Sequence, residues 1–382
     1  MSLLKSRFIE MFGDVINNKK TWPTKRWSDV LNIVNGKNQK KVECENGIYP
    51  ICGSGGKIGK TNEYLTKENS VIIGRKGNIN NPILMKTKFW NVDTAFGLEP
   101  NNKEINVEYL YKFCELFDFQ RLNKTVTIPS LTKSDLLKIE IPVPPMKLQE
   151  EYRNFLAQVD KSKFLLQQIL EKFELLKKSR FIELIGNIQN PKYPLVELNE
   201  ICEFIKDGTH QTPIYTEDRV NGFKFLSSKD VTSQKINWTN IKYIPKELHE
   251  QLYAKLSPKR GDILLAKNGT TGVAAVVDSD EIFDIYVSLA LLRPKSGVNV
   301  SYLCSALNSE DLKRQFNSSL KGIGVPNLHL REIKKARIIF PPIDIQNKIS
   351  SITKQIDKSK FNVFQDQTAA QVKVIVVLHH IC

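Results

Sequence analysis

The chain has 382 residues, which is too long for one ordinary domain and suits two or three units of about 100 to 200 residues. Its 56 Lys and Arg residues against 41 Asp and Glu residues give a net charge of +15, which favours a polyanionic partner such as nucleic acid. Hydrophobic residues make up 41% and charged residues 25% of the chain, which excludes collagen-like, low-complexity and largely disordered proteins.

The six cysteines are scattered and form no C-x-x-C pair, so the sequence signals neither a zinc knuckle nor a disulfide framework. A reducing cytoplasm is the expected location. The N-terminus has no long apolar stretch of the kind found in signal peptides. The longest apolar run, Val374 to Leu378, is far shorter than the roughly 20 residues of a membrane helix, so we expect neither secretion nor membrane spanning.

An internal repeat organises the chain. SRFIEMFGD at 6–14 recurs as SRFIELIGN at 179–187, and segment 128–164 is echoed by segment 325–361. Between these repeats, short β-branched runs alternate with Gly, Asn and Pro turns, a pattern typical of mixed α/β domains. The sequence therefore predicts six segments in chain order: a helical stub at 1–14, an insert at 15–142, a long helix at 143–187, a second insert at 188–340, a second long helix at 341–367 and a divergent apolar tail at 368–382.

The two long helices carry apolar residues at alternating spacings of four and three, the pattern of a coiled-coil seam. We expect the two seams to face each other. Pro144-Pro145 and Pro341-Pro342 permit a helix to start just after them, and Gly186 fits the end of the first helix. The expected pairing residues are Leu148, Phe155, Val159, Leu166, Ile169 and Phe173 in the first helix and Ile345, Ile349, Ile352 and Ile356 in the second.

The second helix loses its match to the first after Gln367, whereas Leu3 aligns with Leu176. The start and the end of the chain therefore resemble two pieces of one helix. We expect a circular arrangement in which residues 3–12 lie beside, or continue, the helix that begins near Ile343.

Motifs for catalysis are incomplete. GSGGKIGKT at 53–61 nearly forms a phosphate-binding P-loop, but Ser54 occupies the position of the first glycine. Residues 81–84 lack the second proline and the aromatic ring of a methyltransferase motif. Asp262 and Lys267 come closest to a nuclease motif, yet Leu265 replaces the second carboxylate. Nucleotide hydrolysis, methyl transfer and cleavage by this chain alone are therefore disfavoured.

The histidines do not change this conclusion. His210 and His329 have no partnered Cys or Ser, so a packed or hydrogen-bonding role is favoured over a catalytic one. His379, His380 and Cys382 lie in the terminal segment and are not expected to hold a metal.

Polar and basic residues gather on the turns of both inserts. Arg and Lys can pair with guanine or phosphate, Asn and Gln with adenine, and Ser or Thr with either base or backbone. A solvated loop is the alternative for any single residue, and the group is favoured because two such inserts accompany the net charge of +15. The candidate DNA-binding residues are Lys57, Lys60, Arg75, Lys76, Asn78 and Asn80 in the first insert and Thr209, His210, Gln211, Thr212, Lys229, Lys267, Asn268 and Thr270 in the second.

Two divergent inserts, each closed by a Pro-Pro element and followed by a heptad helix, resemble the specificity subunit of type I restriction-modification systems. The Pro-Pro elements are IPVPPMKLQ at 141–149 and IIFPPIDIQ at 338–346. Four further segments resemble the target-recognition domains of that family: YPICGSGG at 49–56, DGTHQTP at 207–213, FLSSKDV at 225–231 and GDILLAKNGTTG at 261–272.

The resemblance implies an α+β fold, in which two mixed α/β target-recognition domains are separated by a pair of long antiparallel coiled-coil helices in a circular, pseudo-twofold arrangement. It also implies a non-catalytic subunit that binds double-stranded DNA, each domain reading one half of a bipartite target. Two modification subunits would bring S-adenosylmethionine, and restriction subunits would use ATP and Mg. No cofactor is expected in this chain, and because the inserts differ, the target should be asymmetric.

The helix length agrees with a spacer role. A helix from Leu148 to Ile185 would extend roughly 57 Å, about one and a half turns of B-DNA. One departure from the family pattern is that the chain after Gln367 lacks the heptad. Two alternatives stay open: a coiled-coil assembly protein whose variable domains bind protein rather than DNA, and a single-chain nuclease or methyltransferase.

Overall fold

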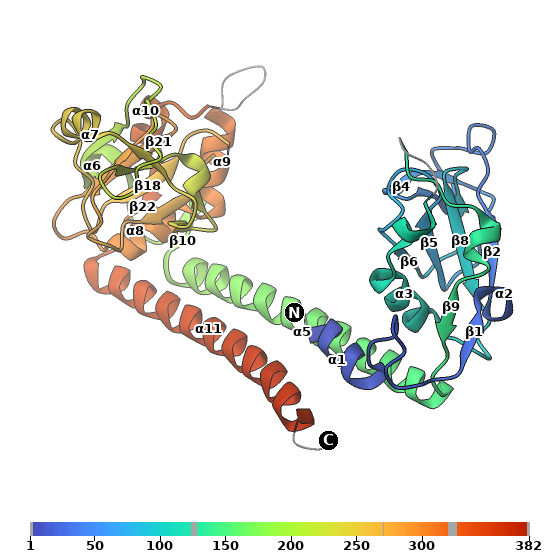
Figure 1. Cartoon of the computed structure of the whole chain (residues 1–382). Coiled ribbons are helices and arrows are strands. Elements are labelled where there is room, and N and C mark those ends of the chain that lie inside the picture. Colours follow the sequence, from blue (N-terminus) through green and yellow to red (C-terminus); the bar gives the residue numbers. More distant parts are fainter. Residues whose placement is uncertain (1–2, 124–127, 270, 320–326, 380–382) are drawn as a thin grey trace. The chain divides into compact units, whose positions relative to one another are not determined.

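The chain consists of two compact units. In the computed structural model, unit 1 comprises residues 1–167 with 367–382, and unit 2 comprises residues 168–366. The predicted inserts each fall inside one unit, and each unit also includes parts of the long helices (Figure 1). The residues that the structure describes are 3–123, 128–269, 271–319 and 327–379.

Unit 1 contains nine strands in its described part: β1 (Thr24–Arg26), β2 (Leu31–Asn35), β3 (Tyr49–Gly53), β4 (Gly56–Thr61), β5 (Ser70–Gly74), β6 (Ile83–Met85), β7 (Trp90–Asn91), β8 (Ala95–Pro100) and β9 (Glu140–Pro142). They form a four-stranded sheet in the order β2-β8-β5-β6, a three-stranded sheet in the order β4-β3-β7, and a ribbon that pairs β1 with β9. The short helices are α1 (Leu3–Phe12), α2 (Trp27–Val30), α3 (Val107–Leu116), the 3-10 helix η1 (Phe119–Leu122) and α4 (Lys133–Leu136).

The strands of unit 2 are β10 (Gly186–Asn187), β11 (Asn190–Pro191), β12 (Leu195–Glu197), β13 (Cys202–Asp207), β14 (Phe223–Leu226), β15 (Val231–Thr232), β16 (Lys235–Ile236), β17 (Lys242–Ile244), β18 (Ile263–Ala266), β19 (Ala274–Val276), β20 (Phe283–Ile285), β21 (Leu289–Pro294) and β22 (Arg337–Ile339). The short helices are α6 (Leu198–Ile201), η2 (Ser228–Asp230), α7 (Lys246–Tyr253), α8 (Val300–Leu307), α9 (Glu310–Ser319) and α10 (Leu330–Lys335).

Both units repeat one strand plan. Unit 2 has a four-stranded sheet in the order β13-β21-β18-β19, a three-stranded sheet in the order β17-β14-β20, and a ribbon that pairs β12 with β22. In each unit the four-stranded sheet is antiparallel, and the three-stranded sheet contains one parallel pair, β3 with β7 or β14 with β20. The shared frame that the sequence repeat predicted is therefore a shared topology.

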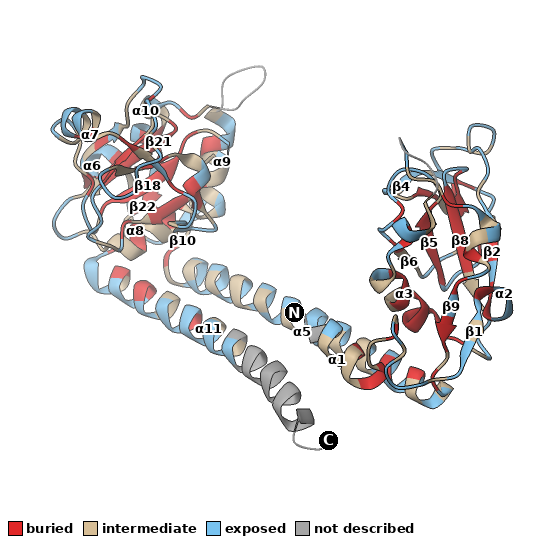
Figure 2. Cartoon of the chain, in the orientation of Figure 1, coloured by how far each residue is buried: buried red, intermediate tan, exposed pale blue. Residues whose placement is uncertain are grey.

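The β-branched runs of the sequence form the centres of these sheets. All five residues of β5, SVIIG, and all four of β18, ILLA, are buried, as Figure 2 shows in red. A strand buried on both faces reads as a continuous apolar run rather than an alternating one, because neither face meets water. The core of unit 1 includes Trp27 and Phe113, and that of unit 2 includes Tyr302 and Phe316.

Each Pro-Pro element ends with a glutamine that fastens the following long helix to its own unit. The side-chain oxygen of Gln149 accepts a hydrogen bond from Asn106 N–H at 2.9 Å, while its amide donates to the Pro144 carbonyl oxygen at 2.9 Å. Gln346 does the same with Asn299 N–H (2.9 Å) and the Pro341 carbonyl oxygen (2.8 Å). Both glutamines are buried, so these bonds satisfy amide groups that water cannot reach.

The long helices are α5 (Met146–Ile185) and α11 (Ile343–His379). Each begins just after its Pro-Pro pair, as predicted. Helix α5 ends just before Gly186, whose φ of +80° suits glycine, and a Cβ there would lie 2.3 Å from the Asn190 carbonyl oxygen. Helix α11 continues beyond Gln367, so the segment predicted as a divergent tail is helical as far as His379.

Helix α1 packs on α5 within unit 1, whereas the sequence placed residues 3–12 beside or in continuation of the helix near Ile343. The rings of Phe8 and Phe12 lie 5.3 and 5.5 Å from that of Tyr152, and Arg7 lies over Phe155 at 5.8 Å. Phe8 also lies 5.6 Å from Tyr109. The related pair in unit 2 is Phe181 with Tyr302, whose rings stack at 6.0 Å. Thus α1 supplies in unit 1 the contacts that the end of α5 supplies in unit 2.

The first part of each predicted seam packs on a domain core rather than on the other seam. Leu148 and Phe155 pack against the core of unit 1, and Ile345 and Ile349 against the core of unit 2. The heptad pattern located an apolar stripe but could not identify what covers it. Val159 and Leu166 are half-buried on α5.

Within unit 2, α5 and α11 are linked in antiparallel order by two ion pairs. Lys360 Nζ lies 2.7 Å from Glu174 Oε1, and Lys177 forms an ion pair with Asp357. The residue number rises on one helix while it falls on the other, which defines an antiparallel pair. Among the predicted pairing residues in this region, Ile356 is buried, Phe173 and Ile352 are half-buried, and Ile169 is 38% exposed.

Candidate nucleic-acid interface

Loops of unit 1 meet at one end of its two sheets. Directly after β2, Gly36 N–H donates to the Ala95 carbonyl oxygen at the start of β8 at 3.2 Å, and Lys37 N–H donates to the Asn91 carbonyl oxygen at the end of β7 at 3.0 Å. The loop after β5 joins them, because Arg75 N–H donates to the Thr94 carbonyl oxygen at 2.8 Å. We call residues 36–38, 75–78 and 91–95 the unit 1 loop cluster.

The predicted residues of the first insert lie in and near this cluster. Lys76 and Asn78 lie within it and are exposed, while Lys57 and Lys60 are exposed on β4, the edge strand of the three-stranded sheet. Arg75 is half-buried, with its guanidinium carbon 5.8 Å from the ring centre of Phe96. Asn80 instead has a structural role, because its side-chain oxygen accepts a hydrogen bond from Phe119 N–H at 2.8 Å.

An equivalent set of loops meets in unit 2. Thr209 N–H donates to the Ile285 carbonyl oxygen at 3.1 Å, and the Thr209 carbonyl oxygen accepts from Val287 N–H at 3.0 Å. The loop after β18 joins them, because Lys267 N–H donates to the Ser288 carbonyl oxygen at 2.8 Å. We call residues 207–212, 227–229, 267–269 and 285–288 the unit 2 loop cluster.

Lys267 differs from the exposed cation that the sequence predicted. Its side chain is only 6% exposed, and its Nζ donates to Asp207 Oδ2 at 2.8 Å. The carboxylate of Asp207 also lies 3.4 Å from Nε2 of His210, a side chain that is 74% exposed. A buried ammonium group with a carboxylate partner is held in place. Lys267 therefore fixes the position of Asp207 within the cluster and does not present a free charge to a ligand.

The other candidates of the second insert are distributed as follows. His210, Gln211, Thr212 and Lys229 are exposed in the unit 2 loop cluster, and Thr209 and Asn268 are half-buried there. Asn268 pairs with Asn327 in an isolated antiparallel bridge. Thr270 lies outside the described residues. The cluster therefore gathers most of the predicted side chains of the second insert, although they are far apart in the sequence.

Sequence reasoning missed the loop after β2. A Cβ on Gly36 would lie 1.8 Å from the Val92 carbonyl oxygen, and one on Gly208 would lie 1.9 Å from the Ile285 carbonyl oxygen. These two glycines allow the same close approach of backbone segments in the two units. Lys37 and Asn38, both exposed, follow Gly36 as Thr209 and His210 follow Gly208. The glycine directly after each strand is the sequence signal that could have located this loop.

The candidate nuclease carboxylate is engaged in a structural ion pair. Both oxygens of Asp262 accept hydrogen bonds from Arg293, from Nε and Nη2, each at 2.8 Å. This carboxylate raises the pKa of the Arg293 guanidinium. Within the described ranges, His, Cys, Asp and Glu side chains form no group of three that could hold a metal ion. Asp262 therefore stabilises β18 against β21 and does not point to cleavage chemistry.

The buried Cys52 and Cys202 and the half-buried Cys304 are not poised as nucleophiles. Burial raises the pKa of the Cys52 thiol to about 11 and those of Cys202 and Cys304 to about 12. A thiol with such a pKa stays protonated near neutral pH, and the thiolate is the reactive form.

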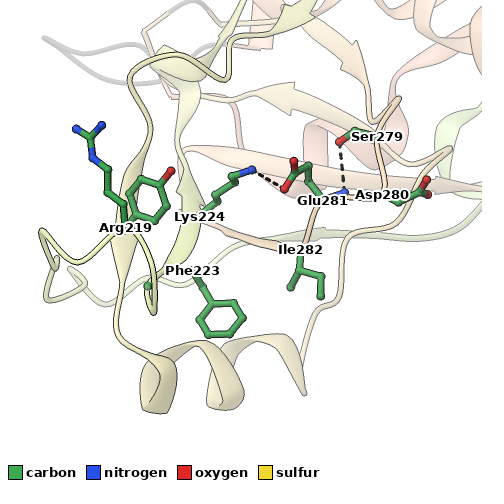
Figure 3. A pocket seen from close by; sticks show the side chains of 9 residues that line it. Arg219, Phe223, Lys224, Ser279, Asp280, Glu281 and Ile282 are labelled. Atoms are coloured by element: carbon green, nitrogen blue, oxygen red, sulfur yellow. Dashed lines mark hydrogen bonds and ion pairs between the residues drawn. The ribbon is translucent and has the colours of Figure 1, made fainter.

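A polar cleft of about 580 Å³ opens on unit 2 beside the strands β14, β17 and β20 (Figure 3). It is lined by Arg219, Phe223, Lys224, Tyr243 and the loop 279–282. Lys224 forms an ion pair with Glu281 there. The lining has as many acidic as basic side chains, Asp280 and Glu281 against Arg219 and Lys224, so it carries no net positive charge.

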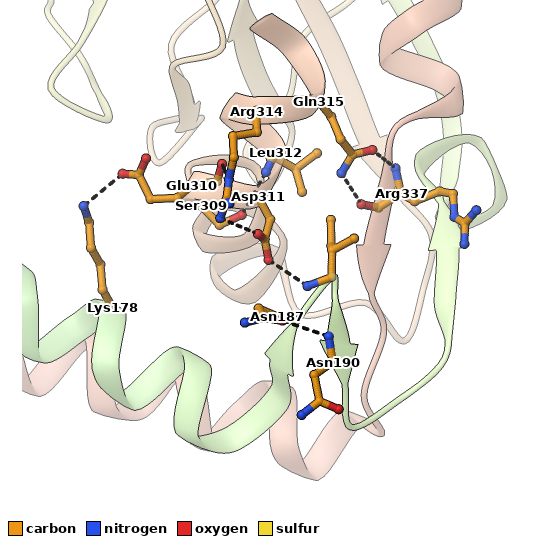
Figure 4. A network of polar contacts seen from close by, with 11 residues as sticks. Lys178, Asn187, Asn190, Ser309, Glu310, Asp311, Leu312, Arg314, Gln315 and Arg337 are labelled. Atoms are coloured by element: carbon orange, nitrogen blue, oxygen red, sulfur yellow. Dashed lines mark hydrogen bonds and ion pairs between the residues drawn. The ribbon is translucent and has the colours of Figure 1, made fainter. Parts of the chain in front are cut away.

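A polar network ties the end of α5 to the helix α9 in unit 2 (Figure 4). Lys178 Nζ lies 2.9 Å from Glu310 Oε1, and Asp311 Oδ2 accepts from Ile188 N–H at 3.0 Å. Gln315 then exchanges two hydrogen bonds with the backbone of Arg337 in β22, at 2.8 and 2.9 Å. These bonds fix the C-terminal end of α5 to the unit that carries the second loop cluster.

Among the helices that the structure describes, none combines the length and the apolar character needed to span a membrane.

The comparisons with known proteins agree with this architecture. The family model of the type I restriction modification DNA specificity domain matches the chain twice, at residues 19–175 and 191–373. The type I restriction enzyme MjaVIII specificity subunit of Methanocaldococcus jannaschii is 25% identical, over 92% of this chain and 89% of that protein.

Two solved structures share the fold at 17% sequence identity. One is the S subunit of a type I restriction-modification system from M. genitalium, with a TM-score of 0.51 over 95% of this chain and 96% of that chain. The other belongs to a type I R-M system studied for complex assembly and conformational transition, with a TM-score of 0.58 over 94% of this chain and 96% of that chain.

The alternatives of a protein-binding assembly factor and of a single-chain enzyme are not favoured. With two matching domains and two loop clusters on one strand plan, the chain belongs to the type I restriction modification DNA specificity family and is a non-catalytic specificity subunit that recognises the DNA target.

Proposed function

We propose that this specificity subunit recognises an asymmetric bipartite DNA sequence, with the unit 1 loop cluster reading one half and the unit 2 loop cluster reading the other. The observation that carries the proposal is that equivalent loops, built on the same strand plan, present different side chains. Lys37 and Asn38 follow Gly36 in unit 1, whereas Thr209 and His210 follow Gly208 in unit 2. Different donors and acceptors select different bases, so the two half-sites differ.

The charge of the chain supports DNA as the partner. A net charge of +15 attracts a polyanion, and exposed lysines such as Lys57, Lys60 and Lys76 can contact phosphates. Contacts to phosphates hold the protein in register, whereas the contacts that specify the sequence are made to base edges. The clusters contain side chains suited to both.

The long helices are proposed to act as a coiled-coil spacer that sets the gap between the half-sites. Helix α5 has 40 residues and extends about 60 Å. Its antiparallel ion pairs with α11 in unit 2, and its contacts with α1 in unit 1, support a pseudo-twofold design in which each unit holds one end of the spacer.

The proposed partners are two modification subunits and the restriction subunits. The modification subunits would bring S-adenosylmethionine, and the restriction subunits would bring ATP and Mg for cleavage. No cofactor is assigned to this chain, which contributes target selection. The proposed location is the cytoplasm, where the complex meets DNA.

The test is selection of bound duplexes from random-sequence DNA by the purified complex of this chain with its modification subunit. We expect enrichment of two unlike half-sites at a fixed gap. The affinity should also fall by orders of magnitude between about 50 and 200 mM salt, because phosphate contacts release counterions. Selection without an enriched motif, or binding that does not respond to salt, would refute the proposal.

A further inference from the structure

The unit 2 loop cluster contains a charge pair that the sequence did not reveal, between the buried Lys267 and the half-buried Asp207. Lys267 Nζ donates to Asp207 Oδ2 at 2.8 Å, and the two side chains are 6% and 18% exposed. The backbone of Lys267 is held on both sides, by Ser288 at 2.8 Å and by Leu328 N–H at 3.0 Å. An unpaired charge at this depth would be costly, so the ammonium group fixes the position of the Asp207 carboxylate.

The same carboxylate oxygen faces a side chain on the surface. Asp207 Oδ2 lies 3.4 Å from Nε2 of His210, whose side chain is 74% exposed. The backbone before it is fixed, because Thr209 is bonded to both Ile285 and Val287. His210 therefore directly follows a residue whose backbone is fixed. Its exposed ring lies between the Asp207 carboxylate and solvent.

The carboxylate determines which ring nitrogen is available to a ligand. In a neutral imidazole one nitrogen carries the proton and the other is a hydrogen-bond acceptor. A carboxylate opposite Nε2 repels a lone pair there and favours the proton on that nitrogen. The other nitrogen, Nδ1, then carries the lone pair and can accept a hydrogen bond.

We infer that His210 reads one base of the half-site recognised by unit 2, by accepting a hydrogen bond at Nδ1 from the exocyclic amino group of adenine or cytosine. Those amino groups are the donors that the bases present in the major groove. Asp207 and Lys267 are positioning residues, because they act through His210 and do not touch DNA themselves. The inference rests on the proposed function and adds to it the chemical group recognised and the device that orients the reader.

The arrangement also explains why Lys267 is buried. An exposed lysine would add a phosphate contact that is the same for every sequence. A lysine paired with Asp207 instead contributes to selectivity, because it holds the carboxylate in place next to the reading side chain.

The experiment compares DNA selected by the complex of the modification subunit with the wild-type chain, with His210→Ala and with the double variant Asp207→Asn/Lys267→Gln. The double variant removes the carboxylate without leaving a buried charge unpaired, so it is expected to fold. Both variants should lose about tenfold discrimination at the same single base pair of the half-site read by unit 2. The other half-site is an internal control, and Lys246→Ala, on the exposed surface of α7, is a matched control expected to leave both half-sites unchanged.

Each outcome decides a different claim. If the wild type selects a bipartite motif and His210→Ala leaves every position unchanged, the inference is wrong while the proposed function stands. A uniform loss of affinity for all sequences would mean a phosphate contact and would also overturn it. If only the double variant keeps the wild-type preference, His210 reads the base without the positioning pair, and that part of the inference fails. Absence of any motif with the wild type would remove the proposed function and the inference together.

Discussion

Two Asp–Arg pairs in unit 2 have the same geometry and differ in their surroundings. Asp262 is buried and accepts two hydrogen bonds from Arg293, each at 2.8 Å. Asp280 is exposed and accepts two from Arg260, at 2.9 and 2.7 Å. Water and salt screen the exposed pair strongly, whereas the buried pair cannot exchange its partner for water. Equal geometry therefore does not imply equal contributions to stability.

Replacing the buried carboxylate should destabilise the protein much more than replacing the exposed one. Asp262→Asn leaves the Arg293 guanidinium without its counter-charge, and we expect a loss of about 3 kcal/mol in the free energy of unfolding of unit 2. Asp280→Asn, the matched control, should give no resolvable change. Urea unfolding of the full chain, followed by circular dichroism, measures both. Equal effects of the two substitutions would show that burial of the pair does not matter.

Single residues also mark the limit of what the sequence predicts. The exposed Lys76 and Asn78 lie in the loop after β5, which agrees with their predicted place on a turn. Lys267 lies on a similar turn after a strand, but its partner Asp207 is on another strand, β13, and only the pairing of the strands brings the two together. Local patterns predict that a lysine follows a strand, and the tertiary fold decides whether its charge is free.

At the scale of elements, the boundaries of the long helices were predictable and their packing was not. Proline pairs and Gly186 act locally through backbone geometry, so the starts of α5 and α11 and the end of α5 follow from the sequence. Along the apolar stripe, Leu148 packs against the core of unit 1, whereas Phe173 is half-buried next to the ion pair of Glu174 with Lys360 of α11. An ideal helix also drifts from a heptad, and Ile169 is 38% exposed while the next residue, Leu170, is half-buried.

The contact between α5 and α11 in unit 2 should weaken in acid. Burial alone would raise the pKa of Glu174, but the hydrogen bond from Lys360 and the charge of Lys177 outweigh it and lower the pKa below its usual value of 4.5. A carboxyl group whose pKa is lower in the folded state stabilises that state above its usual pKa, and the contribution is lost as the pH falls through the lowered value. Glu174→Gln should therefore reduce stability at pH 7, and its difference from wild type should shrink below about pH 4.5.

Thermal unfolding of both proteins between pH 3 and pH 7 measures this difference. Glu151→Gln, which removes an exposed carboxyl group on the same helix, is the control and should show a smaller difference at neutral pH. A difference between wild type and Glu174→Gln that stays constant over the whole range would contradict the role of the ion pair.

At the scale of the whole molecule, the repeat in the sequence predicted two units on one frame, but not the order of their strands. Strand β1 pairs with β9, which places Thr24 opposite Pro142, and β14 lies parallel to β20. Such pairings join segments separated by many turns, and turn signals do not specify them. The divergence of the inserts was visible in the sequence, because the loop residues differ between the two units while the buried strands β5 and β18 are both apolar.

The proposed spacer role of α5 leads to a prediction about the gap in the DNA target. Four residues inserted after Ser162 lengthen the helix by about 6 Å and turn its two ends by about 40° relative to each other. We expect the preferred gap to change by one or two base pairs while both half-sites stay the same, because the loop clusters are untouched. Four residues inserted after Ser296, in an exposed turn of unit 2, form the control and should leave the gap unchanged. DNA selection with the modification subunit measures the gap directly, and the same gap in both insertion variants would exclude α5 as the element that sets it.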